Sequence, residues 1–277
     1  MVQRKSGGCA VRWLALPVAG LMFVAGPAAG DTLRAHYAVS LVGLRIGDLY
    51  ADGAMGAQTY KMTLNARLTG LAAMVSGVKM ALASSGAVKR GTLAPSAYAT
   101  SAANTSETRT LRMALNAGTV RAVEIMPPPE FHGERVPVSD GDKRNILDPT
   151  SALIMTVPAD QPLVGPSACN RTLPIYDGYA RFDIQLNYAG ERDVAVGGYS
   201  GPVSVCTAHY RPISGHLVNS KSTQFMADNN EIEVWLAPVE HAHVVVPLHV
   251  SMPTMAGHLL VDAVDFQTTS SGDVTTR

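Results

Sequence analysis

Hydrophobic and polar residues alternate along two segments of the chain, Tyr60–Leu68 and Phe182–Tyr188. Successive side chains of a strand point to opposite faces of a sheet, so this period of two predicts strands with one buried face. Weaker alternation predicts eleven further strands: Tyr37–Leu41, Ile46–Ala54, Met80–Val88, Ala97–Asn104, Thr108–Leu115, Val120–Ile125, Thr172–Tyr176, Val203–Tyr210, Ile232–Leu236, Val244–Val250 and Leu259–Phe266. The pattern therefore indicates about thirteen strands.

One pair of neighbouring strands carries a strong hairpin signal. Asp177 and Gly178 stand between Tyr176 and Tyr179. A two-residue type I′ turn needs positive φ at both central residues, which Asp-Gly adopts readily. We therefore expect a tight hairpin at this point.

Two segments are predicted to be helical. Thr69–Ser76 is short and apolar on nearly every side. Asp148–Met155 begins with a capping aspartate followed by Pro149 at the first helical position, where its missing N–H is harmless. We expect both helices to plug the sheet, the first packing Leu71, Met74 and Val75 against the strand residues Leu64 and Leu68.

The predicted fold class is mainly β, with one large curved antiparallel sheet, a β-spiral or half-open barrel, and two short plug helices. A long meander protects its edges by curling or closing. Residues 31–277 contain no linker that would divide them, so we predict one domain. The proline-rich stretch at 127–129 is interpreted as an excursion within that sheet.

Residues 1–30 have the three parts of a cleavable secretory signal. Basic residues come first, an apolar run ends at Ala25, and small residues precede Asp31. The alternatives are a membrane anchor, for which the run is short of ~20 residues, and a lipoprotein modified at Cys9, which precedes the apolar run instead of following it. We predict a periplasmic protein that starts at Asp31 and has no transmembrane segment.

Composition excludes some classes of function. Three of the 22 basic residues lie in the leader, leaving 19 against 22 acidic residues, a net charge of −3. Nucleic-acid binding is not expected without a basic footprint. No nucleophile elbow, HExxH zinc motif, phosphate loop or dinucleotide fingerprint occurs, so neither an enzyme nor a cofactor is predicted.

Two cysteines, Cys169 and Cys206, remain after removal of the leader. In an oxidising compartment their default state is one structural disulfide. In a simple meander their strands would flank a third strand and lie ~9.5 Å apart, which is too far for a disulfide. We therefore expect Cys169 in a loop after Gly165 and Pro166.

Histidines are frequent in the C-terminal half. If His241 and His243 shared one face of a strand, a metal site would be conceivable, with a third ligand from the region of His249 and His258. The competing interpretation is an exposed turn. No metal site is predicted.

Several segments occur in an order that resembles a known family. They are Tyr37–Gly47, Leu93–Tyr98, Leu147–Leu153, Ile175–Asp183 and Ile232–Leu236. In this order they resemble the exported bacterial proteins grouped as domain of unknown function 3108. The resemblance implies cysteines that match Cys169 and Cys206, a curved sheet like those of the lipoprotein carriers LolA and LolB, and no established catalytic residues.

The predicted function is a non-enzymatic periplasmic envelope protein whose concave face binds a lipid, an acyl chain or a hydrophobic peptide. The alternative is an envelope assembly factor that binds protein or glycan partners without a lipid. Methionine suits a pocket for variable chains, and six methionines are placed on inward faces or plug helices: Met62, Met74, Met80, Met113, Met126 and Met155. The candidate ligand contacts are Leu71, Met74, Val75, Leu153 and Ile154.

Overall fold

The computed structural model describes residues 30–270 except 71, 74–76 and 90. In this part of the chain, fourteen strands form one antiparallel sheet. The strands are β1 (Asp31–Leu41), β2 (Leu44–Met55), β3 (Thr59–Leu68), β4 (Lys79–Lys89), β5 (Thr92–Ala103), β6 (Thr108–Asn116), β7 (Thr119–Met126), β8 (Met155–Thr156), β9 (Arg171–Tyr176), β10 (Arg181–Val196), β11 (Tyr199–Ser214), β12 (Ile232–Val239), β13 (Val244–Thr254) and β14 (Gly257–Thr269). The helical elements that lie wholly within the described residues are a 3₁₀ turn, η1 (Ser151–Leu153), and two α-helices, α2 (Pro166–Cys169) and α3 (Lys221–Asp228).

The sheet consists of two meanders joined through the first and last strands. Its order is β7-β6-β5-β4-β3-β2-β1-β14-β13-β12-β11-β10-β9, and the short β8 pairs with β13 outside this path. Pairing between β1 and β14 runs from Thr32 opposite Thr269 to Leu41 opposite Leu259. The sheet therefore has two edge strands, β7 in the first meander and β9 in the second.

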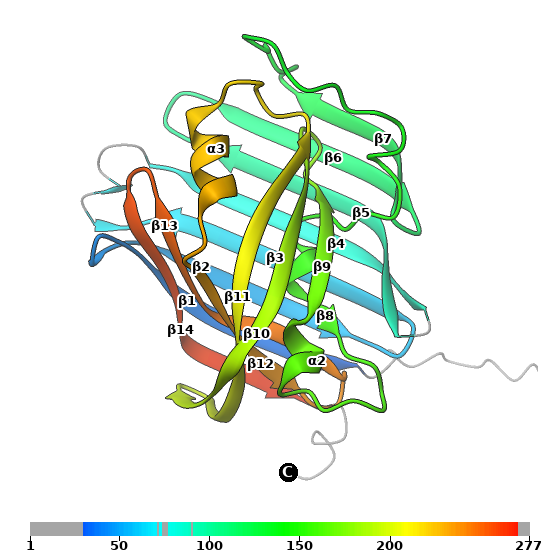
Figure 1. Cartoon of the computed structure of the whole chain (residues 1–277), viewed down its shortest axis with the longest axis vertical. Helices are drawn as coiled ribbons and strands as arrows, with labels where there is room; N and C mark the ends of the chain where they lie inside the picture. Colours follow the sequence, from blue (N-terminus) through cyan, green and yellow to red (C-terminus); the bar gives the residue numbers. More distant parts are fainter. Residues whose placement is uncertain (1–29, 71, 74–76, 90, 271–277) are drawn as a thin grey trace, which may run out of the picture.

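The sheet curls so strongly that its two halves face each other. In Figure 1, β9, β10 and β11 lie in front of β1–β7. The tip of the β10–β11 hairpin folds onto β14, where the Phe266 N–H donates to the Gly197 carbonyl (2.6 Å). This contact holds the tip of the hairpin against β14.

A connecting segment links the two edge strands at one point. The Val120 N–H of β7 donates to the Lys143 carbonyl (2.9 Å), and the Leu147 N–H donates to the Pro174 carbonyl of β9 (2.7 Å). The edges are not paired with each other, so the sheet is a curled, open structure.

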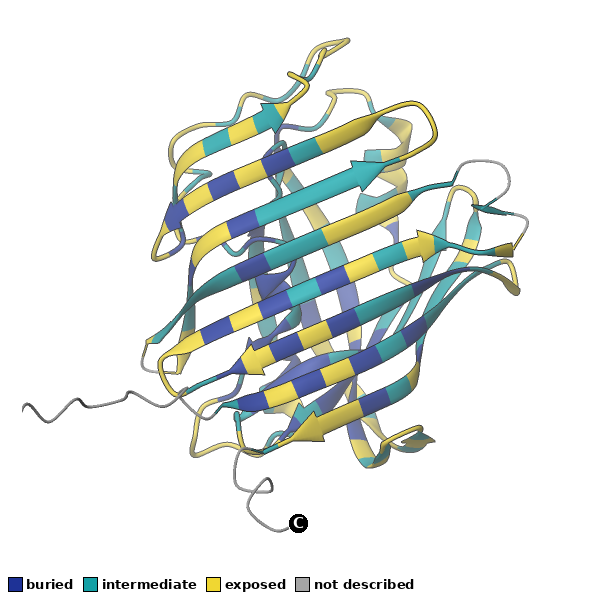
Figure 2. Cartoon of the chain, turned by 180° about the vertical axis from the view of Figure 1, so that it is seen from behind, coloured by how far each residue is buried: buried dark blue, intermediate teal, exposed yellow. Residues whose placement is uncertain are grey.

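Alternation of side chains produces the core. Figure 2 shows buried and exposed residues alternating along the strands of the first meander. The inward side chains fill the interior, and Phe266, Leu33 and Met62 are at most 1% exposed. The curled sheet therefore encloses a packed core instead of one large central cavity.

All thirteen predicted strands are confirmed, with β8 as an additional one. β10 and β11 extend eight and four residues further at the tip of their hairpin than the alternation predicted. The Asp177 hairpin is confirmed, but its two-residue turn is wrong: Tyr176 pairs with Arg181, so the turn has four residues. The Asp177 carboxylate stabilises this wider turn by accepting the N–H groups of Tyr179 (2.8 Å) and Ala180 (2.7 Å).

The helix predicted at Asp148–Met155 is wrong. Only Ser151–Leu153 is helical, as a 3₁₀ turn, and Met155–Thr156 is strand β8. Asp148 turns inward to buried hydroxyl groups, and the chain after Leu153 pairs with β13, so no α-helix can continue. In the first predicted helix, Gly70, Ala72 and Ala73 are helical, while Leu71, Met74 and Val75 lie outside the described residues.

The methionine prediction holds in part. Met62, Met113 and Met155 are buried, at 1%, 2% and 3% exposure. Met80 and Met126 are 40% and 52% exposed because they lie at strand ends, beyond the reach of the core. Met74 lies outside the described residues.

Candidate functional site

The antiparallel meanders give the molecule two distinct ends. One, here called the cavity end, carries the turns β2–β3, β4–β5 and β12–β13 together with Asp31. The other, here called the α3 end, carries the turns β1–β2 and β13–β14 and helix α3. The two ends differ in which side chains they expose.

A cavity of about 640 Å³ opens at the cavity end. Its lining is drawn from β2–β5, from residues 154–159 and from the β12–β13 turn. Its apolar side chains include Met55, Tyr60, Val88, Leu93, Ile154 and Val157. Its polar side chains include Asp31, which is buried, and Thr92 and His241, which are both exposed. The volume falls within the ~300–1,000 Å³ of ligand pockets.

A buried polar network fixes the segment that carries Ile154. Asp148 is fully buried and accepts hydrogen bonds from the Ser84 hydroxyl (2.9 Å) and the Ser151 hydroxyl (2.5 Å). Its second oxygen accepts the N–H groups of Thr150 (3.0 Å) and Ser151 (2.9 Å). The Tyr60 hydroxyl lies 2.7 Å from the Ser151 hydroxyl. The network ties residues 148–151 to β3 and β4, and so positions Ile154 at the cavity.

Burial controls the ionisation of this network. Desolvation raises the pKa of Asp148 above its ordinary value, against the opposing effect of its four hydrogen bonds. Burial also raises the pKa of Tyr60 to about 12. The hydroxyl groups therefore stay protonated. Asp148 is not among the residues that line the cavity, and its contacts are those of a structural anchor.

The five predicted ligand contacts are not seen together. Ile154 is 2% exposed and lines the cavity, and Leu153 packs beside it against the core. Leu71, Met74 and Val75 lie outside the described residues. Their neighbour Thr69 donates to the Ile46 carbonyl (2.9 Å) at the α3 end. That position is ~30 Å along β3 from Tyr60, given the rise of a strand. Sequence reasoning missed Met55, Val88 and Leu93, which lie at turns beside the cavity.

The two neighbouring histidines lie in a turn, as the competing interpretation held. Residues 240–243 connect β12 to β13, and the His243 side chain donates to the Pro158 carbonyl (2.9 Å). His249 pairs with Asp262, and His258 lies 2.8 Å from the Ser251 hydroxyl. Within residues 30–270, as far as they are described, no three histidine, cysteine or acidic side chains gather as metal ligands.

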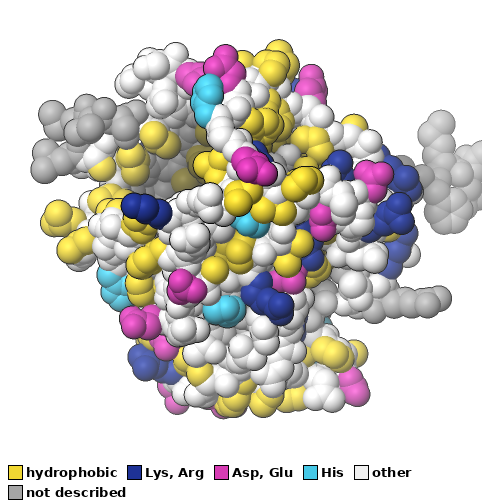
Figure 3. All heavy atoms as spheres, turned by 45° about the horizontal axis from the view of Figure 1, so that its top comes forward, with side chains coloured by type: hydrophobic (Ala, Val, Ile, Leu, Met, Phe, Trp, Pro, Cys, Tyr) yellow, Lys and Arg dark blue, Asp and Glu magenta, His cyan; other side chains and the backbone are white. Residues whose placement is uncertain are grey.

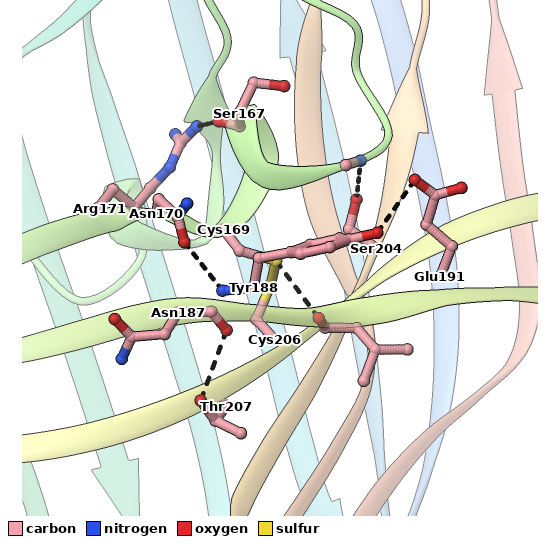
Figure 4. The surroundings of a disulfide bond; sticks show 12 residues. Ser167, Cys169, Asn170, Arg171, Asn187, Tyr188, Glu191, Ser204, Cys206 and Thr207 are labelled. Atoms are coloured by element: carbon pink, nitrogen blue, oxygen red, sulfur yellow. Dashed lines mark hydrogen bonds between the residues drawn. A yellow bond between two sulfur atoms is a disulfide. The ribbon is translucent and has the colours of Figure 1, made fainter.

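The predicted disulfide joins Cys169 to Cys206, with their Cα atoms 5.5 Å apart. Cys169 lies outside the strands, as expected, in the single turn α2, and Cys206 lies in β11 (Figure 4). Asn170, next in the chain, accepts the Tyr188 N–H of β10 (2.9 Å). The disulfide thus fastens the segment before β9 onto the sheet.

No helix in the described part of the chain is long and apolar enough to span a membrane.

Comparison with known proteins gives a family, together with distant similarity among solved structures. No curated protein matches the chain. Among solved structures, it is similar to a beta-barrel-like protein of domain of unknown function DUF1849 from Brucella abortus, with a TM-score of 0.46 and 9% identity over 87% of this chain and 98% of that chain. The likeness to LolA and LolB stays a prediction. Residues 34–264 match the model of the family described as protein of unknown function (DUF3108), and the chain therefore belongs to that family.

Proposed function

We propose that this chain is a non-enzymatic periplasmic protein that binds the apolar part of a lipid or of a hydrophobic peptide in the cavity at its cavity end. The observation that carries the proposal is the convergence of six apolar side chains from β2–β5 and residues 154–157 on one space of about 640 Å³. The leader predicted at residues 1–30 supports the periplasmic location.

The chemistry of the cavity favours an acyl chain with a small polar head. Burial of each chain methylene contributes about 0.8 kcal/mol before ordering costs. The exposed Thr92 and His241 offer hydrogen bonds to a carboxyl or ester group. Deeper in, Met55 and Ile154 are 6% and 2% exposed and offer only apolar contacts.

The experiment is titration of the purified protein with a fluorescent fatty acid, after native mass spectrometry for co-purified lipid. Leu93→Arg places a charge in the cavity from a half-buried position beside a turn, and we expect it to weaken binding by about tenfold or more. Val264→Arg, at a 42% exposed position of β14, is the matched control and should bind like the wild type.

Thermal unfolding of both variants checks that each is folded. Absence of saturable binding by the wild type would contradict the proposal, as would equal binding by a folded Leu93→Arg variant.

A second candidate function, an envelope assembly factor without a lipid ligand, is favoured by the packed interior and the free edge of β7. Beyond the hydrogen bond of Val120, no described segment pairs with the outer edge of this eight-residue strand. Exposed edges accept strands of partner proteins. Failure of lipid binding in the titration would make this the better interpretation.

A further inference from the structure

Large exposed hydrophobic side chains are concentrated at the α3 end. Of the eleven among the described residues, ten lie at that end, and the exception is Val264 in the middle of β14. The most exposed are Leu44 (72%), Val42 (66%) and Met255 (63%). Figure 3, in which the top of Figure 1 is turned toward the viewer, shows hydrophobic side chains in separate patches between polar ones. Exposed hydrophobic side chains that stand singly are ordinary on a protein surface, so it is their concentration at one end of the molecule that calls for an explanation.

Two adjacent turns carry the most exposed of these side chains. Val42 and Gly43 form the β1–β2 turn, and Met255 lies in the β13–β14 turn. The turns are joined by a hydrogen bond from the Val42 N–H to the His258 carbonyl (2.9 Å). A Cβ on Gly257 would lie 2.3 Å from a Val42 methyl group, so this glycine makes room for the valine.

The conformation of Val42 is unfavourable for its residue type. Its φ is +50°, in the left-handed region that asparagine and glycine adopt readily and β-branched residues avoid. Asparagine would suit this turn better for stability. Val42 is 66% exposed, so the folded chain offers little packing to offset the cost of this conformation.

The unpaired charge beside these turns is positive. Residues 41–47 and 253–259 contain no acidic residue, and their one arginine, Arg45, is paired with Asp48 of β2. Lys79, at the start of β4 on the same end, is exposed and has no ion pair among the described residues. Basic side chains beside apolar ones are typical of proteins that rest on anionic membranes.

We propose that the α3 end docks on the surface of a lipid bilayer, with Val42, Leu44 and Met255 inserted among the lipids. The three side chains protrude separately from turns, an arrangement that suits a fluid apolar layer better than a shaped groove. Lys79, which has no ion pair among the described residues, then faces the anionic head groups. Phe225 of α3, 38% exposed, extends the contact, since Asn229 at the end of this helix donates to the Pro253 carbonyl (2.9 Å).

The test measures whether the secreted protein sediments together with vesicles of phosphatidylcholine and phosphatidylglycerol. Mass spectrometry first establishes the N-terminus of the protein. The variant Val42→Asn/Leu44→Thr/Met255→Ser replaces the tips with residues that suit their backbones. We expect it to keep the melting temperature and to lose vesicle binding by about tenfold or more. Val264→Ser should bind like the wild type.

Wild-type binding should also weaken with added salt and without phosphatidylglycerol. The proposal is overturned if the wild type does not sediment with vesicles, or if the folded triple variant sediments equally well. Sedimentation velocity tests whether a second copy of the chain covers this surface instead. If the wild type forms a dimer that the triple variant does not form, and the wild type does not bind vesicles, the proposal is also overturned. Fatty-acid binding at the cavity end should not change in the triple variant, so the two proposals fail separately.

Discussion

The carboxyl group of Asp148 connects three parts of the chain that are far apart in sequence. It accepts hydrogen bonds from Ser84 of β4 and from Thr150 and Ser151, and Ser151 contacts Tyr60 of β3. Asp148→Ala removes the acceptor and leaves buried donors unpaired, at about 1–3 kcal/mol each. Asp148→Asn keeps an acceptor for the two N–H groups. We therefore expect the alanine variant to be clearly less stable than the asparagine variant in urea denaturation, and equal stabilities would contradict the role of this network.

The same residue makes stability depend on pH. Because burial raises the pKa of Asp148, the folded protein binds this proton more tightly than the unfolded chain, and stability is lost as pH rises from the ordinary carboxyl pKa toward the raised folded one. Asparagine does not ionise. As pH rises above the ordinary carboxyl pKa toward the raised folded one, Asp148→Asn should thus gain stability relative to wild type. A constant difference across that range, measured by urea denaturation, would argue against a raised pKa.

Among the elements, the short helix α2 depends on its covalent link to β11. Cys169 and Cys206 are 37 positions apart, and a crosslink of that span contributes roughly 4 kcal/mol by restricting the unfolded chain. Cys169→Ser/Cys206→Ser should therefore lower the free energy of unfolding by about that amount in urea denaturation. Reduction of the wild type should reproduce the loss, and reduction of the double variant should change nothing further. Reactive thiols at both positions in the native secreted protein would contradict the disulfide.

At the scale of the whole molecule, the β10–β11 hairpin folds back onto β14. Gly198, at the hairpin tip, has φ +80°, and an added Cβ would lie 2.7 Å from the Phe266 carbonyl oxygen. Gly43 has nearly the same φ, +77°, with nothing within 4 Å of an added Cβ. Gly43→Ala therefore measures only the cost of placing a side chain in the left-handed conformation, which is about 1–2 kcal/mol. We expect Gly198→Ala to lower the melting temperature more than Gly43→Ala, and equal losses would show that the fold-back contact is unimportant.

The sequence by itself determined the strands and the disulfide partners. Alternation is a property of each strand alone, because one face meets the core wherever that strand lies in the sheet. It is therefore readable in Tyr60–Leu68 without knowledge of the neighbours. Where both faces are largely solvated, as in the second half of β10, the alternation fades and the predicted strand ends too early. Helix α3 was missed for a similar reason, since it buries no residue completely and offered only the Ser220 cap, which accepts the Thr223 N–H (3.2 Å).

Only the tertiary structure decided how these elements meet. The pairing of β1 with β14, the inward turn of Asp148 and the fold-back at Gly198 join residues that are distant in sequence, and no local pattern encodes such pairs. The helix predicted at Asp148 was wrong because capping residues describe a local preference, which buried hydroxyl groups and pairing with β13 overrode. The cavity combines turns from both halves of the chain. Ile154 could be proposed from sequence because it lies in a short apolar segment, whereas Leu93 reaches the cavity only through the way the sheet curls. The alternation of buried and exposed side chains is a local property of one strand, whereas the curvature of the sheet is a collective property of all its strands.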